Sequence, residues 1–98
     1  MANSTLLDSA SITKHLGSLP GWALSDDQKQ IHKEFRFKDF IEAMAFVNQL
    51  VEPAEAMNHH PDLRIVYNRV SISLSTHDAG GLTEKDMELA KAIESKQS

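Results

Sequence analysis

The chain has 98 residues, a formal net charge of −4 and no cysteine. This length is typical of one domain, and the absence of cysteine excludes disulfides, thiolate metal sites and a cysteine nucleophile. The ten basic residues are scattered among fourteen acidic ones, which argues against direct nucleic-acid binding. No apolar run approaches the roughly 20 residues that span a bilayer, and no signal-like segment opens the chain. We therefore expect a single cytoplasmic domain over residues 1–98 that does not associate with membranes.

The N-terminal part is predicted to hold one short helix. Residues 1–7 are expected to be disordered, as chain ends often are. A helix follows over residues 9–16, with Asp8 or Ser9 able to cap its first turn. Gly17 stands where a left-handed residue commonly ends a helix.

Two strands are predicted next, over residues 22–25 and 29–37, after a turn at Pro20 and Gly21. The second strand alternates polar residues with apolar ones at Ile31, Phe35 and Phe37. Lys33 falls on its apolar face, which is typical of an edge strand. Trp22, at the start of the first strand, is predicted to lie in the core.

A long helix over residues 39–51 is predicted to follow. Its apolar residues recur at helical spacing, and Asp39 with Glu42 has the spacing of a capping box. Pro53 should kink or end this helix. A further turn over residues 54–57 could begin with Pro53 at its first position.

Two more strands, residues 62–67 and 69–75, are predicted on either side of a tight turn near Asn68. Alternation in the second of these predicts one buried and one polar face. A loop at 79–81 leads to a last helix over residues 83–95. The order helix, two strands, helix, two strands, helix favours an α+β fold with an antiparallel sheet.

The last helix begins with a capping signature of its own. Thr83 is predicted as its N-cap, with Asp86 three residues later. Asp86 is therefore either a helix cap or a catalytic residue, and the sequence leaves both open.

The segment from Glu55 to Asp86 concentrates side chains that can transfer protons. Three of the five histidines lie in it, and histidine exchanges a proton near pH 7 without a large pKa shift. Glu55 and His59 are four residues apart, so on a helix they would face each other. His59 and His60 are adjacent and must point in different directions. His77 ends a predicted strand next to a loop, a common place for a functional side chain.

The spacing of this segment resembles that of the pterin-4a-carbinolamine dehydratase family. The pattern is Glu-x3-His-His-Pro-x5-Tyr-x9-His-x8-Asp, and the chain matches it at Glu55, His59, His60, Pro61, Tyr67, His77 and Asp86. The resemblance runs from about Leu19 to Ile93. It implies a four-stranded antiparallel sheet with helices packed on one face, and a homodimer or a homotetramer built from dimers.

The resemblance also implies an activity. The family removes water from a 4a-hydroxytetrahydropterin to give the quinonoid dihydropterin, with no metal and no organic cofactor. The expected catalytic residues are His59, His60, His77 and Glu55, and the expected substrate-binding residues are His60, Asn58, Pro61, Ser75, Thr76 and Asp86. We expect a biopterin from an aromatic amino acid hydroxylase as substrate, which would place the enzyme in tetrahydrobiopterin recycling.

The reaction explains why histidines are needed. Loss of hydroxide from C4a needs an acid, and loss of the N5 proton needs a base. We assign His59 as the principal acid and base with Glu55 tuning it, His77 as a second group on the other side of the ring, and His60 as a positioning residue.

Three other interpretations stay open. The three histidines with Glu55 could ligate zinc, although adjacent histidines diverge and the usual ligand spacing is absent. The family's animal members also act as a dimerisation cofactor for a homeodomain transcription factor, so a non-enzymatic binding module is the second. The third is an enzyme acting on a pterin of molybdopterin metabolism.

Overall fold

The computed structural model describes residues 6–96. Its elements, in chain order, are α1 (Ser9–Leu16), β1 (Ala23–Leu24), β2 (Ile31–Arg36), α2 (Phe40–Gln49), α3 (Val51–Met57), β3 (Asp62–Val66), β4 (Arg69–Leu74), the 3₁₀ turn η1 (His77–Ala79) and α4 (Glu84–Lys96). None of the helices in this described range is both long and apolar enough to cross a membrane.

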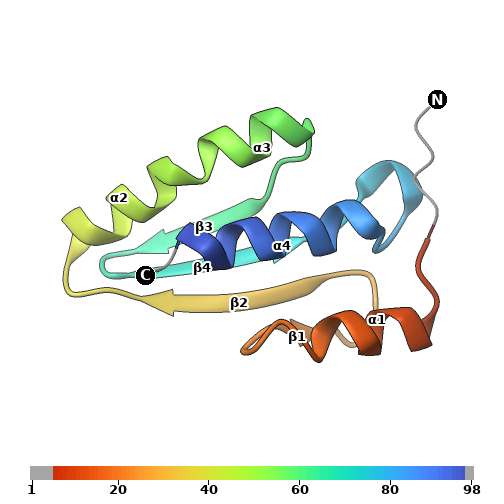
Figure 1. Cartoon of the computed structure of the whole chain (residues 1–98). Coiled ribbons are helices and arrows are strands. Elements are labelled where there is room, and N and C mark those ends of the chain that lie inside the picture. The colour runs from red at the N-terminus through yellow and green to blue at the C-terminus, as the bar shows by residue number, and fades with distance from the viewer. Residues whose placement is uncertain (1–5, 97–98) are drawn as a thin grey trace.

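The four strands form one antiparallel sheet in the order β1-β2-β4-β3. The helices lie on one side of it, with α4 crossing in front of β4, α1 beside β1, and α2 and α3 towards the β3 edge (Figure 1). The predicted α+β class and the predicted four-stranded antiparallel sheet are confirmed. The predicted alternation in β4 is confirmed as well, because Val70, Ile72 and Leu74 are buried between less buried serines.

The core lies between this sheet and the helices. It joins β2 and β4 to α2 and α4 through side chains that include Ile31, Phe35, Phe46, Ile72 and Ile93. Trp22 is buried, as predicted, and its ring meets Phe35 edge to face at a centroid distance of 6.2 Å.

The strand containing Lys33 is an edge strand only in part. β2 pairs with β4 along its whole length, whereas β1 pairs with Ile31 and His32 alone, so among the described residues no strand lies beside β2 on that side from Lys33 onward. The charge is accommodated because the Lys33 ammonium donates to the Pro20 carbonyl and pairs with Glu94. Its nitrogen also lies 4.7 Å from the centroid of the Phe35 ring. Lys33 thus lies on the apolar face of β2, just past the end of β1, with polar partners of its own.

Helix α1 has the predicted cap but not the predicted end. Asp8 accepts a hydrogen bond from the backbone N–H of Ser11, and this bond lowers the pKa of the Asp8 carboxyl. The capped form is therefore favoured above the ordinary pKa of aspartate and is lost as the pH falls through the lowered value. Gly17 is right-handed (φ −61°), contrary to the prediction, because the chain continues into tighter turns in which Ser18 N–H donates to the His15 carbonyl.

Disorder over residues 1–7 stays a prediction, and of these residues the structure describes Leu6 and Leu7. Leu7 donates its N–H to the Leu82 carbonyl at 2.9 Å and packs against the core. Residues 1–5 lie outside the described residues.

The predicted long helix is divided in two at Leu50, which ends α2 and begins α3. Asp39 caps α2 by accepting from the Glu42 N–H, as predicted. Pro53 is the third residue of α3 rather than its first. Because proline has no N–H and its ring collides with the carbonyl four residues earlier, the helix breaks before it rather than at it.

The turn between β3 and β4 carries a strained residue. Val66 pairs with Arg69, so Tyr67 and Asn68 form a two-residue loop, and β3 is one residue shorter than predicted. Tyr67 has φ 54° and is 63 % exposed. Turns of this kind favour glycine at a positive φ.

We expect Tyr67→Gly to be more stable than Tyr67→Ala by about 0.5–1 kcal/mol, because only the alanine keeps the strained Cβ while both variants lose the ring. Urea unfolding of both variants measures the difference. An alanine variant as stable as the glycine variant would contradict the strain.

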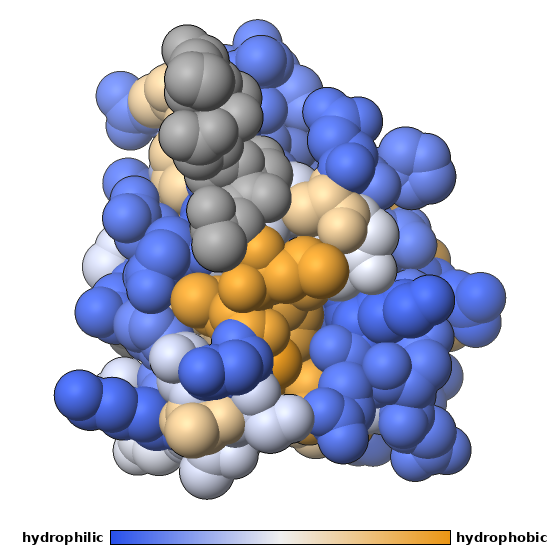
Figure 2. Space-filling model, turned by 90° about the vertical axis from the view of Figure 1, so that its right-hand side faces the viewer, coloured by the Kyte–Doolittle hydropathy of each residue, from blue (hydrophilic) through white to orange (hydrophobic). Residues whose placement is uncertain are grey.

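Apolar side chains remain exposed on several elements. Phe40 and Ile41 on α2, Val51 on α3 and Val66 on β3 are each about half exposed or more. At the end of the molecule that carries α1, Figure 2 shows an apolar area surrounded by hydrophilic side chains. Because a domain of this size buries a small core, exposed apolar surface is where association would add stability.

Candidate active site

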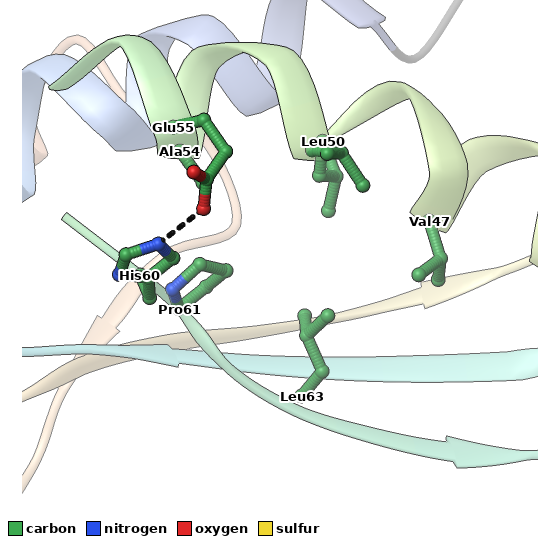
Figure 3. Close-up of a pocket in the computed structure, with 8 residues that line it drawn as sticks. Val47, Leu50, Ala54, Glu55, His60, Pro61 and Leu63 are labelled. Atoms are coloured by element: carbon green, nitrogen blue, oxygen red, sulfur yellow. Dashed lines mark hydrogen bonds and ion pairs between the residues drawn. The ribbon is translucent and has the colours of Figure 1, made fainter. Parts of the chain in front are cut away.

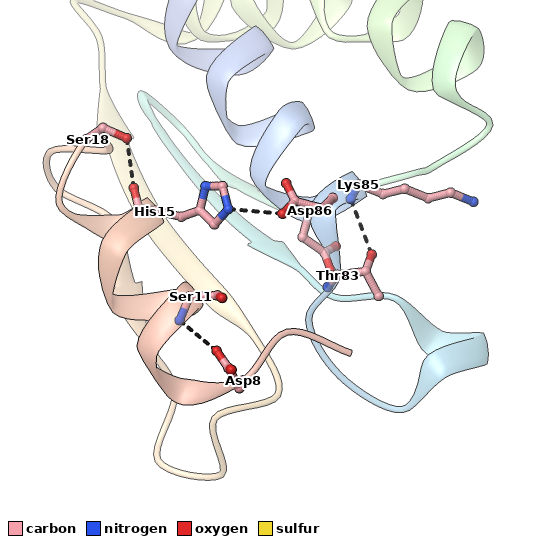
Figure 4. Close-up of polar contacts among 8 residues, drawn as sticks. Asp8, Ser11, His15, Ser18, Thr83, Lys85 and Asp86 are labelled. Atoms are coloured by element: carbon pink, nitrogen blue, oxygen red, sulfur yellow. Dashed lines mark hydrogen bonds and ion pairs between the residues drawn. The ribbon is translucent and has the colours of Figure 1, made fainter. Parts of the chain in front are cut away.

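The first turn of α4 is built by the predicted capping box. The backbone N–H of Thr83 donates to Asp86 Oδ2 at 2.9 Å, and the Lys85 N–H points at the Thr83 hydroxyl at 3.3 Å (Figure 4). A capping interaction of this kind stabilises a helix by about 1 kcal/mol. Asp86 is therefore a helix cap, as one of the two interpretations held.

Asp86 is also the partner of a histidine. Its side chain is fully buried, and Oδ1 lies 2.6 Å from His59 Nε2. Oδ2 accepts a second hydrogen bond, at 2.8 Å, from the hydroxyl of Thr76. With Asp86 as a carboxylate, which only accepts, Nε2 of His59 is the donor in this contact and Nδ1 is the nitrogen left for proton exchange. The two interpretations of Asp86 are thus compatible, since each oxygen serves one of them.

The expected pairing of Glu55 with His59 was wrong. α3 ends at Met57, and Asn58 is left-handed (φ 50°, ψ 45°), so the chain turns away before His59 could complete the helical spacing. His59 points inward to Asp86. Glu55 Oε2 instead lies 2.6 Å from Nε2 of His60, and both of these side chains are exposed.

The three histidines line one cavity of about 390 Å³. Asn58, Ser75 and Thr76 line it with them. This volume falls in the range of small-molecule sites. His59 is 8 % exposed, whereas His60 and His77 are exposed. The structure thus brings together six of the residues expected in the site from two separate segments of the chain, 58–60 and 75–77.

Glu55 and Pro61 line a neighbouring groove instead. That groove has a volume of about 220 Å³, and its walls are Val47, Leu50, Val51, Ala54 and Leu63 (Figure 3). His60 lines both cavities, so its ring stands between a polar space and an apolar one. Glu55 reaches the polar cavity only through His60.

Thr76 is placed to hold the site rather than to touch a ligand. Its hydroxyl donates to Asp86 and lies 2.7 Å from the Thr83 hydroxyl. Its N–H donates to the Gly81 carbonyl, and its own carbonyl accepts from Ala79 and Gly80. Since the hydroxyl, N–H and carbonyl of Thr76 all form hydrogen bonds within the protein, its geometry favours a supporting role over the expected substrate contact.

Two residues of the cavity were not expected from the sequence, Asp78 in η1 and Lys85 in α4. The sequence did contain a signal for Lys85, because a basic residue in the first turn of a predicted helix opposes the helix dipole and is unusual there. Asp78 left none, since an acidic residue next to a glycine loop is ordinary.

Within residues 6–96, no three histidine, aspartate or glutamate side chains are grouped so that they could hold a metal ion. His59 directs one ring nitrogen to Asp86 and His60 directs one to Glu55, so these side chains form two separate pairs rather than one group.

Comparison with known proteins shows the family to which the chain belongs. A family model described as pterin 4 alpha carbinolamine dehydratase matches residues 5–96. The chain belongs to the pterin-4-alpha-carbinolamine dehydratase family. A relative from Cyanothece sp. is 53 % identical over 88 residues, which cover 90 % of this chain and 89 % of the relative. A relative from Rhizobium meliloti is 50 % identical over 88 residues, covering 90 % and 85 %. Both carry the provisional name pterin-4-alpha-carbinolamine dehydratase.

Two solved structures share the fold. A transcriptional coactivator/pterin dehydratase from Brucella melitensis has a TM-score of 0.92 and 34 % identity, covering 96 % of this chain and all of its own. A pterin dehydratase-like protein described as a RuBisCO assembly factor of the alpha-carboxysome has a TM-score of 0.66 and 21 % identity, covering 78 % and 88 %. The second likeness shows the fold alone.

Proposed function

We propose that the protein dehydrates a 4a-hydroxytetrahydropterin to the quinonoid dihydropterin and water by histidine acid–base catalysis. One observation carries the proposal: His59, His60 and His77 line a single cavity, and His59 is held there by the buried Asp86. A 4a-hydroxytetrahydrobiopterin in the cytoplasm, supplied by an aromatic amino acid hydroxylase, is the substrate we propose.

The reaction is a balanced loss of water. The C4a–O bond breaks as the leaving oxygen takes a proton, the N5 electron pair forms the C4a=N5 double bond, and the N5 proton is lost to a base. His59 is the proposed principal acid and base, acting through Nδ1. Asp86 takes the place of the carboxylate first assigned to Glu55, because a fixed carboxylate behind Nε2 orients the ring.

The other two histidines divide the remaining work. His77 is the exposed first residue of η1 and, on our proposal, serves the opposite side of the pterin ring. His60 is held by Glu55 and positions the pterin. Asn58 and Ser75 are proposed substrate contacts, and Pro61 shapes the boundary with the apolar groove.

We also propose that the protein works as a homodimer or homotetramer. The support is the exposed apolar surface on α2, α3 and β3 of a small domain.

A dehydratase assay on chelator-treated protein tests the proposed reaction. With the carbinolamine generated in situ and the quinonoid product followed by absorbance, we expect acceleration that survives chelation. Activity lost on chelation and restored by zinc would instead support a metal site. No acceleration by folded protein would refute the proposal.

A binding module is the second candidate function. The similar Brucella melitensis structure is named both a coactivator and a pterin dehydratase, so one fold of this kind carries both descriptions. The histidine cavity distinguishes the two candidates, because a pure scaffold has no use for three histidines around one space. A folded, inactive protein in the assay above would make this second candidate the better account.

A further inference from the structure

A second polar cavity adjoins the cavity of the three histidines. Its volume is about 240 Å³, and its lining includes Ser75, Thr76 and His77, which also line the histidine cavity. The rest of its wall comes from the turn between β1 and β2 and from the loop after η1: Asp27, Lys29, Gln30, Gly80 and Gly81. These two loops lie at the same end of the molecule (Figure 1), and a Cβ on Gly81 would lie 4.0 Å from Lys29 Cγ. We call this space the turn cavity.

The histidine cavity therefore has two neighbours of opposite character. His60 separates it from the apolar groove, whose walls are mainly aliphatic. Ser75, Thr76 and His77 separate it from the turn cavity, whose wall carries a carboxylate, an ammonium and an amide. A substituent on a molecule in the histidine cavity would meet aliphatic side chains past His60 and hydrogen-bonding groups past His77. The polarity of the substituent decides which neighbour it suits.

Asp27 offers the turn cavity a fixed hydrogen-bond acceptor. Its Oδ1 accepts from the Ser25 hydroxyl at 2.6 Å and from the Lys29 N–H at 3.0 Å. The bonds from Ser25 and Lys29 lower the pKa of the carboxyl, so Asp27 is ionised at neutral pH. Its Oδ2 forms no hydrogen bond or ion pair with residues 6–96. The carboxylate is thus held in place by one oxygen while the other is available to a ligand.

The two charges at the turn cavity favour an uncharged polar ligand. Asp27 is an anion and Lys29 a cation, and the Gln30 amide both donates and accepts. A charged group of either sign would meet a like charge in this wall, whereas an apolar group would displace water without replacing its hydrogen bonds. A hydroxyl both donates and accepts, so it can bond to the carboxylate and to the ammonium. The turn cavity therefore suits a hydroxylated chain.

A pterin carries its variable side chain at C6, which is bonded to N5. His77 is proposed to act beside the C4a–N5 bond, so a chain at C6 begins near His77 and can pass it into the turn cavity. We propose that the turn cavity is the subsite for a hydroxylated C6 side chain and that Asp27 is the specificity-determining residue that accepts hydrogen bonds from its hydroxyls. This inference rests on the proposed function, because it assumes that the pterin ring occupies the histidine cavity. The dihydroxypropyl side chain of the proposed biopterin substrate is of this kind.

Calorimetric titration with two stable dihydropterins tests the subsite. Dihydrobiopterin carries the dihydroxypropyl chain at C6, and 6-methyldihydropterin carries a methyl group there, so the ring is the same and only the hydroxylated chain differs. We expect the wild-type protein to bind dihydrobiopterin about tenfold more tightly than the methyl compound. Equal affinities, or tighter binding of the methyl compound, would overturn the inference and leave the proposed reaction standing.

Variants within one turn assign the preference to Asp27. In Asp27→Ala the ratio of the two affinities should fall to within about twofold because dihydrobiopterin binds less tightly, while the affinity for 6-methyldihydropterin is unchanged. Asp26→Ala removes the same charge from the neighbouring exposed residue, which does not line the turn cavity, and should keep the ratio. A preference that survives Asp27→Ala, or a loss of affinity shared by both compounds, would overturn the role of Asp27. Failure to bind either compound would overturn the proposed function as well.

Discussion

Replacing His59 by glutamine is expected to lower kcat/KM of the dehydratase reaction by about 10²–10⁴-fold. Glutamine places an amide nitrogen near the position of Nε2, so it can still donate to Asp86 Oδ1, which His59 meets at 2.6 Å. It cannot exchange a proton near neutral pH. The variant therefore removes the acid–base chemistry while keeping the buried carboxylate paired, and the loss should fall on kcat more than on KM.

His32→Gln is the matched control, because His32 is an exposed histidine on β2 that does not line the histidine cavity. It should keep wild-type kinetics. A His59→Gln enzyme with unchanged kcat, alongside a His60→Gln enzyme that loses it, would reverse the roles that we propose for the two histidines.

Replacing Asp86 by alanine is expected to lower the free energy of unfolding by about 3–5 kcal/mol. Asp86 is fully buried and accepts hydrogen bonds from His59, Thr76 and the Thr83 N–H. Alanine removes the acceptor for all three donors, takes away the cap of α4 and leaves a cavity. Few side chains of the described chain combine a helix cap with a buried ionic contact, which is why we expect so large an effect.

Chemical denaturation followed by circular dichroism measures this loss. Glu88→Ala, an exposed acid on the same helix, is the control and should change stability by no more than about 0.5 kcal/mol. Asp86→Asn separates the two roles, because an amide oxygen can still cap Thr83 while the charge behind His59 is gone. A destabilisation of Asp86→Ala no larger than that of Glu88→Ala would show that the buried network contributes little.

Sequence patterns predicted most elements because their signals are local. The alternation in β4 follows from the two-residue period of a strand, and the caps at Asp39 and Thr83 follow from spacing within a single helical turn. The histidine set was found for a related reason, since its spacing along the chain resembles that of a known family. These features need no knowledge of what lies across the fold.

Tertiary structure decided which partners the charged groups meet. Asp86 and His59 are 27 residues apart in the sequence and come together because α3 packs against α4. Glu55 met His60 rather than His59 because one left-handed residue, Asn58, ended the helix on which the predicted pairing depended. Lys33 is accommodated on the apolar face of β2 because Glu94 and the Pro20 carbonyl, both distant in sequence, neutralise and bind its ammonium. A buried charge is stable only with a partner. In this protein the sequence by itself determined which residues are charged. Only the packing of the helices on the sheet determined their partners.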